Sequence, residues 1–395
     1  MPEREVYLDY ENSGLIIPES LKAMENAYKW GGKGHPSIPH LMGWTSYQLL
    51  YEATENIASA VNCSPNELVF THSGTEANNL AIIGSAGLSQ NRRKILVSSI
   101  EHLSVIFPAE RLEKHGFKII KIPVDNEGFI DLNFLSQHVD RETLLVSIAA
   151  VNHEIGTVQN MSAIRDIVKD RDENILIHTD ACDALGKIPL DVKDLGVDLA
   201  SFSSHKVYGP KGVGALYVKE GIKLEPVIHG QISTQKLWPG VENVPGIIGF
   251  SKAVEIIHKN FEEYKSRMIK LRDRLIDGIL EKIDYTILNG PAGSKRSPDN
   301  VNISFLYCEG EALTVELSLR GIYVSSGSAC TSRVLEPSHV LLSIGRRYEE
   351  AHGSLLMKVS PFITIADIEY VLDVLPIVVN RIRSLNPIKP GMEVR

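Results

Sequence analysis

A short turn in the middle of the chain carries the residues best suited to covalent chemistry. It contains Ser203, His205 and Lys206 and lies between two apolar runs, 197–202 and 213–218. Runs of this kind, rich in β-branched or aromatic residues and bounded by glycine, predict buried strands. A lysine near a strand end can form a Schiff base with an aldehyde when its neighbours lower its pKa. The alternative is a solvated surface lysine, because most lysines are exposed.

A second group of residues is of the type that binds a phosphate. Gly74 and Thr75 follow the apolar run 67–71 and open a helical segment. Backbone N–H groups and a hydroxyl at the start of a helix favour an anion. The alternative is an ordinary helix start with Ser73 or Thr75 as N-cap.

A histidine and an aspartate follow two further runs. His102 could stack on a flat aromatic ring and move protons near neutral pH, or simply cap its turn. Asp180 would be costly to bury without a cation, and a pyridinium nitrogen is such a cation. The alternative is that Asp180 caps a helix beginning near Ala181. Together with Lys206 and the phosphate group, these residues predict a pyridoxal phosphate site.

One cysteine stands in a setting that favours reactivity. Cys330 lies in a stretch of small residues, 325–332, which predicts an accessible and mobile thiol. The other cysteines are Cys63, Cys182 and Cys308, and their wide spacing suggests neither a disulfide framework nor a zinc knuckle. Cys182 is the main competitor of Cys330, since it lies two residues after Asp180.

Seven apolar runs alternate with amphipathic segments and must position these residues. This alternation predicts βαβ units and a mainly parallel sheet. One long amphipathic stretch, 251–283, leads to a smaller α+β unit at the C-terminal end. The seven runs are 67–71, 94–99, 118–123, 143–151, 174–178, 197–202 and 213–218.

Composition narrows the function. The chain has 395 residues, 43% hydrophobic and 23% charged, which fits a globular protein of two domains. Its net charge of −8, without a basic block, argues against nucleic acid or an anionic membrane as partner. It has no apolar run of membrane-spanning length and no leader pattern, so we expect a cytoplasmic protein.

The sequence resembles the cysteine desulfurases of the class V aminotransferase family over about residues 5–385. The loop 325–332 is the most specific match, because it separates this group from other class V aminotransferases. The matching stretches are 7–9, 73–79, 101–102, 152–157, 178–181, 201–206, 208–212, 325–332, 335–341 and 350–354.

The resemblance implies a fold-type I pyridoxal-phosphate-dependent transferase. A large domain, 15–260, would hold a mainly parallel seven-stranded sheet. A smaller α+β domain, built from 1–14 and 261–395, would carry the cysteine loop. The family forms homodimers with the site near the interface.

The resemblance also implies roles for single residues. Lys206 would hold the cofactor and shuttle a proton, Asp180 would pair with the ring nitrogen, and His102 would stack on the ring. The Cys330 thiolate would attack the sulfur of L-cysteine, leaving alanine and a persulfide. That sulfur would pass to an iron–sulfur scaffold or to an acceptor for tRNA thiolation, and Cys330 could itself ligate a cluster. The remaining cofactor contacts would come from Gly74, Thr75, His153, Asp183, Ser203 and His205.

The sequence departs from the family around the substrate. The usual Asn-Ala-Thr-Thr near the start reads Glu-Asn-Ser-Gly at 11–14, an asparagine becomes His153, and a glutamine becomes Asp183. Leu356 stands where the family has the arginine for the substrate carboxylate. Lys358 faces the same side of its strand and could take that role, as could His153.

In the loop after residue 228, Trp238 replaces an arginine and Val241 replaces a threonine. These departures keep two other functions open. One is a pyridoxal phosphate reaction on a different amino acid, such as transamination or β-elimination. The other is a non-catalytic sulfur relay or assembly protein that retains Cys330.

Overall fold

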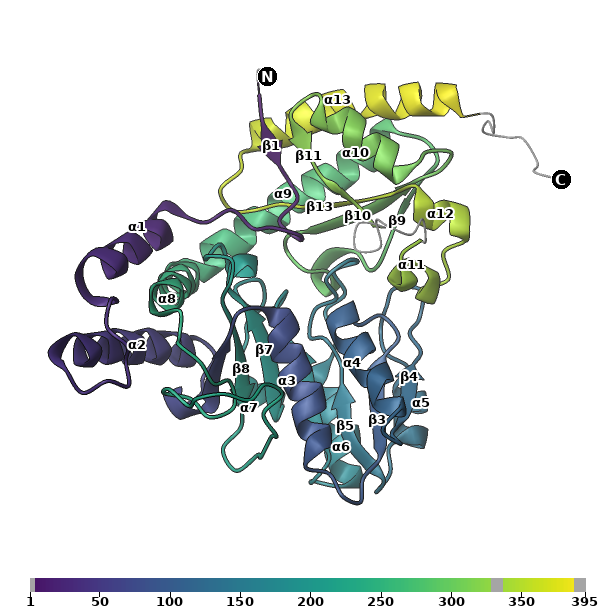
Figure 1. Cartoon of the computed structure of the whole chain (residues 1–395). Helices are drawn as coiled ribbons and strands as arrows, with labels where there is room; N and C mark the ends of the chain where they lie inside the picture. Colours follow the sequence, from purple (N-terminus) through teal and green to yellow (C-terminus); the bar gives the residue numbers. More distant parts are fainter. Residues whose placement is uncertain (1–3, 328–336, 387–395) are drawn as a thin grey trace.

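The computed structural model describes residues 4–327 and 337–386, in which a larger and a smaller sheet lie one above the other, with a short two-stranded pairing beside the smaller sheet (Figure 1). The larger sheet has seven strands in this part of the chain. Only β8 runs antiparallel to its neighbours, which confirms the predicted mainly parallel sheet. In order across the sheet, the strands are β2 (Leu68–Thr71), β8 (Gly214–Val218), β7 (Leu199–Ser203), β6 (Leu176–Asp180), β5 (Thr143–Ser147), β3 (Lys94–Ser98) and β4 (Lys118–Ile122).

Helices cover both faces of this sheet, which explains why its strands are continuous apolar runs rather than alternating ones. On one face α3 (Gly74–Gly87) and α4 (Leu103–Glu113) bury their apolar sides. The other face packs against α2 (Leu41–Ala60), α5 (Leu132–His138), α6 (Met161–Arg171), α7 (Val192–Leu195) and α8 (Val244–Lys259). The helix α1 (Pro18–Asn26) lies beside α8.

The smaller sheet is antiparallel and has four strands in the described residues: β12 (Ser325–Ser326), β13 (Ser354–Lys358), β10 (Asn300–Phe305) and β9 (Thr286–Leu288). Its core includes Leu355, Met357 and Val359, so Leu356 and Lys358 face the opposite side. The helices behind it are α9 (Phe261–Lys282), α10 (Gly310–Ser318) and α13 (Ile365–Leu385).

The N-terminal strand β1 (Val6–Tyr7) returns to the C-terminal part of the chain, where it pairs in parallel with β11 (Ile322–Tyr323). Two short helices, α11 (His339–Ser343) and α12 (Tyr348–His352), precede β13. The predicted α/β architecture with an additional α+β unit is thus confirmed. The domain boundaries, 15–260 against 1–14 with 261–395, stay a prediction.

The stretch 251–283 is two helices rather than one. Asn260 has φ −108° and ψ 20°, outside the helical region, and separates α8 from α9. Its side-chain Nδ2 donates to the carbonyl of Ile256 at 2.8 Å, which satisfies a carbonyl near the end of α8. The described residues contain no helix long and apolar enough to cross a membrane.

Candidate active site

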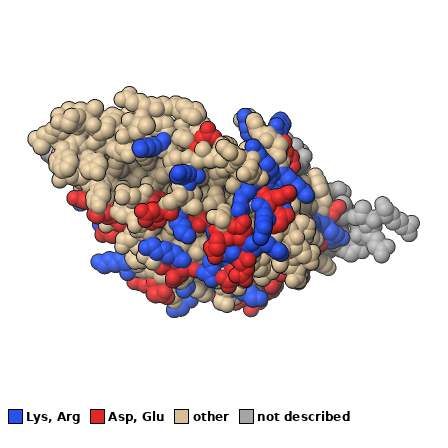
Figure 2. Space-filling model, turned by 90° about the horizontal axis from the view of Figure 1, so that it is seen from below, with Lys and Arg blue, Asp and Glu red and all other residues tan. Residues whose placement is uncertain are grey.

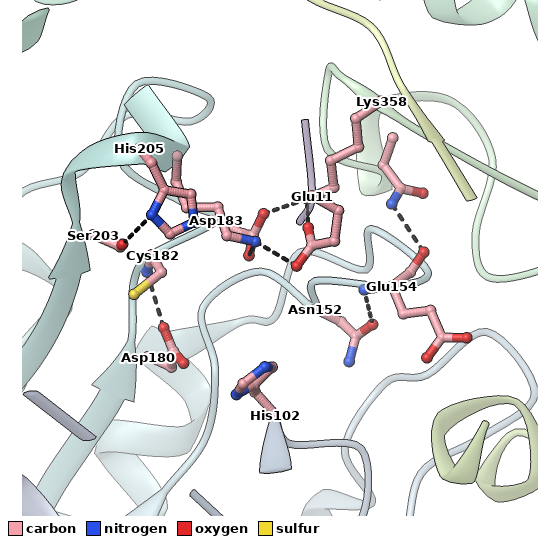
Figure 3. A network of polar contacts seen from close by, with 12 residues as sticks. Glu11, His102, Asn152, Glu154, Asp180, Cys182, Asp183, Ser203, His205 and Lys358 are labelled. Atoms are coloured by element: carbon pink, nitrogen blue, oxygen red, sulfur yellow. Dashed lines mark hydrogen bonds and ion pairs between the residues drawn. The ribbon is translucent and has the colours of Figure 1, made fainter. Parts of the chain in front are cut away.

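A cavity of about 220 Å³ lies where β6, β7, α3 and α4 meet the N-terminal segment (Figure 3). Eleven residues were predicted for the site, and nine of them line this cavity: Gly74, Thr75, His102, His153, Asp180, Asp183, Ser203, His205 and Lys206. Lys358 lies directly behind it, and Cys330 is outside the described residues. A larger cavity of about 350 Å³ beside α8 contains none of these residues.

Asp180 ends β6 and is 8% exposed. Asn78 Nδ2 donates to its Oδ2 at 2.7 Å, and the backbone N–H of Cys182 donates to its Oδ1 at 2.9 Å. In the described residues no lysine, arginine or histidine forms an ion pair with it. A turn follows instead of the helix expected as the alternative near Ala181. Asp180 is therefore a buried carboxylate open to a cation in the cavity.

His102 is the N-cap of α4. Its Nδ1 accepts from the backbone N–H of Ser104 at 3.1 Å and lies 2.7 Å from the Ser104 hydroxyl. Nδ1 is thus an acceptor, and the ring proton belongs on Nε2. His102 therefore caps α4 and still lines the cavity with its ring.

Asn78, which was not predicted as a site residue, links Asp180 to Ser104, the partner of His102. Its Nδ2 donates to Ser104 Oγ at 2.8 Å as well as to Asp180, while its Oδ1 is buried without a hydrogen-bond partner. Asn78 could have been found from its place in the motif 73–79, since it lies one helical turn after Gly74 on the buried side of α3.

His153 lies against His102, with ring centroids 5.1 Å apart and planes at 79°. Burial lowers the pKa of the His153 imidazole well below its usual value, and His102 lowers it further. His153 is therefore neutral near pH 7 and can act as a hydrogen-bond donor or acceptor.

The start of α3, predicted to bind a phosphate, lines the cavity and is a capped helix start, the alternative considered for this segment. Ser73 caps the helix by accepting from the N–H of Glu76 at 3.2 Å. A Cβ on Gly74 would come within 2.6 Å of Cys182 Sγ, so only glycine fits this approach. Burial and the nearby Lys206 lower the pKa of His205 to about 4, and the ring pairs with Ser203 Oγ at 3.0 Å.

Lys206 belongs to a ring of four buried charges, whose other members, Glu11, Asp183 and Lys358, are labelled in Figure 3. Its Nζ bonds one oxygen of Glu11 and lies 3.1 Å from Asp183 Oδ2. Lys358 Nζ bonds Asp183 Oδ1 and lies 2.5 Å from Glu11 Oε2. Each carboxylate therefore bridges both ammonium groups, and no side chain in the ring is more than 11% exposed.

This ring keeps Lys206, Lys358 and Asp183 ionised. Burial alone would lower the pKa of Lys206, but Asp183 and Glu11 outweigh it and raise the pKa above its usual value. The pKa of Lys358 is raised in the same way. Burial opposes the charge on Asp183, yet the two lysines hold its pKa well below the usual range. The lowered lysine pKa that attachment to an aldehyde requires is not provided by these neighbours.

Glu11 was not predicted as a site residue, although its position was noted as a departure from the family. Leu356 is 4% exposed and brings no charge to the face that it shares with Lys358. Burial raises the pKa of the Cys182 thiol well above its usual value, so this competitor of Cys330 is not a thiolate.

Comparison with known proteins assigns the chain to a family. The class-V aminotransferase family model matches residues 6–370. Cysteine desulfurase IscS 1 of Archaeoglobus fulgidus is 43% identical over 383 residues, covering 97% of this chain and 99% of the relative. Cysteine desulfurase IscS of Dictyoglomus turgidum is 43% identical over 393 residues, covering 99% of each chain. The chain belongs to the cysteine desulfurase family.

Solved structures agree. A NifS-like protein superposes with a TM-score of 0.89 at 33% identity, covering 96% of this chain and all of that one. The structure described as SspA in complex with cysteine has a TM-score of 0.78 at 30% identity, covering 91% and 99%. The likeness confirms the predicted fold-type I architecture.

The cofactor of this family is pyridoxal 5′-phosphate, and the cavity fits it. Asp180 is a buried carboxylate that pairs with no cation in the part of the chain that the structure describes, and the start of α3 is a cradle that a Cβ on Gly74 would fill. The unpartnered Oδ1 of Asn78 is a further polar atom at this cavity.

Proposed function

We propose that this cysteine desulfurase converts L-cysteine to L-alanine and takes up the sulfur on Cys330. The Cys330 thiolate attacks the substrate sulfur, an S–S bond forms, and the Cβ–S bond breaks. Its electron pair passes to Cβ, which gains a proton and becomes the methyl group of alanine. We also propose that the persulfide passes to an iron–sulfur scaffold or a tRNA-thiolating acceptor in the cytoplasm.

The observation that carries this proposal is the meeting of Asp180, His102 and Lys206 in one cavity. Pyridoxal phosphate supplies an aldehyde for attachment and a ring that accepts electrons from the substrate. Lys206 would hold it covalently, Asp180 would pair with its ring nitrogen, and His102 would lie on its face. The phosphate would be held at the start of α3 by Gly74, Thr75, Ser203 and His205.

Two assigned residues have a more open role. His153 and Asp183 line the same cavity and would contact the cofactor or substrate. As a neutral imidazole, His153 can donate a hydrogen bond there. Asp183, held ionised, can only accept, so it cannot replace a glutamine as donor to an oxygen anion.

Lys358 would bind the substrate carboxylate in place of the missing arginine. Its ammonium is 3% exposed and is held by Glu11 and Asp183, so the substrate would have to compete for it. A lysine is a point charge without the planar fork of arginine, and we expect weak, poorly saturating use of free cysteine.

The test measures alanine, sulfide and persulfide after incubation with L-cysteine. We expect equal amounts of alanine and transferred sulfur, with one added sulfur atom on the Cys330 peptide by mass spectrometry. Cys330→Ser should abolish persulfide formation, whereas the matched control Cys182→Ser should retain it. Lys206→Ala should abolish alanine formation.

Other outcomes identify the alternatives. A keto acid, or pyruvate with ammonia, in place of alanine would indicate transamination or β-elimination. Sulfur on Cys330 that comes only from an added persulfide donor, without consumption of cysteine, would indicate a relay protein.

A further inference from the structure

Glu11, Asp183 and Lys206 of the charged ring line the cavity and face an incoming ligand, whereas Lys358 lies behind them. The side chain of Lys358 is only 3% exposed. A ligand carboxylate in this cavity therefore meets Glu11 and Asp183 before it can reach Lys358. Two carboxylates brought together at low exposure repel strongly.

The charge balance of the ring changes when the cofactor is attached. In the structure, Lys206 and Lys358 balance Glu11 and Asp183. A Lys206 nitrogen bound to the cofactor carries at most one N–H, so Lys358 becomes the one ammonium group of the ring left to pair with both Glu11 and Asp183. The neighbouring Lys187 and Asp299, 3.6 Å apart, form a neutral pair and leave this balance unchanged.

Removal of Glu11 would relieve Lys358 of one of its two carboxylate partners and leave Asp183 as the other. Glu11 Oε2 lies 2.5 Å from Lys358 Nζ, the place that a substrate carboxylate would take. Leu356, on the same face of β13, supplies no second cation.

We propose that Glu11 determines substrate specificity by acting as an internal carboxylate that competes with the α-carboxylate of the substrate for Lys358. The site consequently accepts aminothiols without a free carboxylate, such as amides of cysteine, at least as well as free cysteine. This proposal rests on the proposed function for its substrate, but it concerns binding and can be tested without turnover.

The test uses L-alanine and L-alaninamide, which lack sulfur and differ in the carboxylate. Their dissociation constants are measured by titration calorimetry on the cofactor-loaded protein. We expect wild type to bind alanine no more tightly than alaninamide. Glu11→Gln leaves Lys358 balanced by Asp183 alone. It should lower the dissociation constant of alanine about tenfold and change that of alaninamide by no more than about twofold. The ratio of the two constants is compared between variants, which cancels the different amine pKa values of the ligands.

Glu11→Asp is the matched control, because it keeps the charge, and its ratio should remain close to that of wild type. An unchanged ratio in Glu11→Gln overturns the proposal. If that variant does not fold, Leu356→Arg provides the second arm: it adds a cation on the same face and should tighten alanine but not alaninamide. A response of both ligands alike, or of neither, also overturns the proposal. If the ratio responds but cysteine yields no alanine, only the proposed function fails.

Discussion

Asn78 joins the two groups expected to hold the cofactor ring, Asp180 and His102. It is 1% exposed, and its amide donates to Asp180 on one side and to Ser104, the partner of His102, on the other. A hydrogen bond to a charged group contributes about 1.5–3 kcal/mol. Asn78 therefore acts as a positioning residue for both.

Replacing Asn78 by alanine should weaken cofactor binding about tenfold, since Asp180 loses its side-chain donor. The measurement is the dissociation constant of pyridoxal phosphate, followed by fluorescence quenching of the cofactor-free protein. Asn79→Ala is the control, because Asn79 lies next to it on α3 and its side chain bonds the backbone carbonyl of Thr75 at 2.8 Å rather than Asp180 or Ser104. Equal affinity in wild type and Asn78→Ala would show that Asn78 does not position the site.

Residue types at strand ends predicted much of the candidate site. Asp180, Lys206 and His102 follow buried strands, and parallel strands bring such residues to one edge. Glu11 could not be found in this way. It lies outside any strand pattern, and its partner Lys206 is 195 positions away, so only the folded chain shows the pairing.

The loop after β5 fastens the larger sheet to the smaller one. The backbone carbonyl of Glu154 accepts from Asn300 Nδ2 at 2.9 Å and from Asn302 Nδ2 at 3.2 Å, both on β10. Its side chain accepts from Ser338 Oγ at 2.6 Å, at the start of α11. Burial raises the pKa of the Glu154 carboxyl from 4.5 to about 8, so this contact involves a protonated acid near neutral pH.

The raised pKa of Glu154 predicts a pH dependence of stability. The Glu154 carboxyl loses its proton near pH 4.5 in the unfolded chain but keeps it up to about pH 8 in the folded protein. The free energy of unfolding therefore falls as the pH rises from 4.5 to about 8. Each unit of pKa shift corresponds to about 1.4 kcal/mol. Glu154→Gln, which mimics the protonated form, should remove this part of the decline.

Thermal unfolding midpoints measured from pH 5 to pH 9 would test it. The exposed Glu113 on α4 supplies the control, Glu113→Gln, whose profile should follow wild type. Parallel profiles for wild type and Glu154→Gln would contradict a raised pKa.

Whole strands were easier to predict than helix ends. Five of the seven strands of the large sheet, β2, β3, β5, β7 and β8, are buried at every residue and read as short, mainly apolar runs, whereas the edge strand β4 exposes Lys118 and Lys121. The break between α8 and α9 has no comparable signal. Asn260 is an ordinary polar residue until its side chain is seen to bond the carbonyl of Ile256.

Over the whole molecule, charge is distributed unevenly. Residues 34–51 contain no lysine, arginine, aspartate or glutamate. The left-hand lobe in Figure 2, on the side where Figure 1 places α1 and α2, is nearly free of charged side chains. Large apolar side chains are exposed there, among them Leu41 at 81%, Trp44 at 57% and Met42 at 48%. Contiguous apolar patches of this kind mark interaction surfaces.

We propose that a second copy of this chain covers this apolar surface, in agreement with the homodimer implied by the family resemblance. The absence of Lys, Arg, Asp and Glu from residues 34–51 suits a self-complementary surface, since this segment would bring no like charges together across a two-fold axis. An interface of standard size needs about 800 Å² from each partner, and the exposed faces of α1 and α2 together would have to provide it.

Introducing charge at the centre of this lobe should separate the two copies. Leu41→Asp with Trp44→Asp would place four buried carboxylates in a symmetric interface, which costs several kcal/mol and shifts the equilibrium to monomer at micromolar concentration. The mass in solution, measured by size-exclusion chromatography with light scattering, should be that of a dimer for wild type and of a monomer for the double variant. Ile377→Asp on α13, 63% exposed and outside the lobe, should stay dimeric. A monomeric wild type, or a dimer that tolerates both charges, would place the association surface elsewhere.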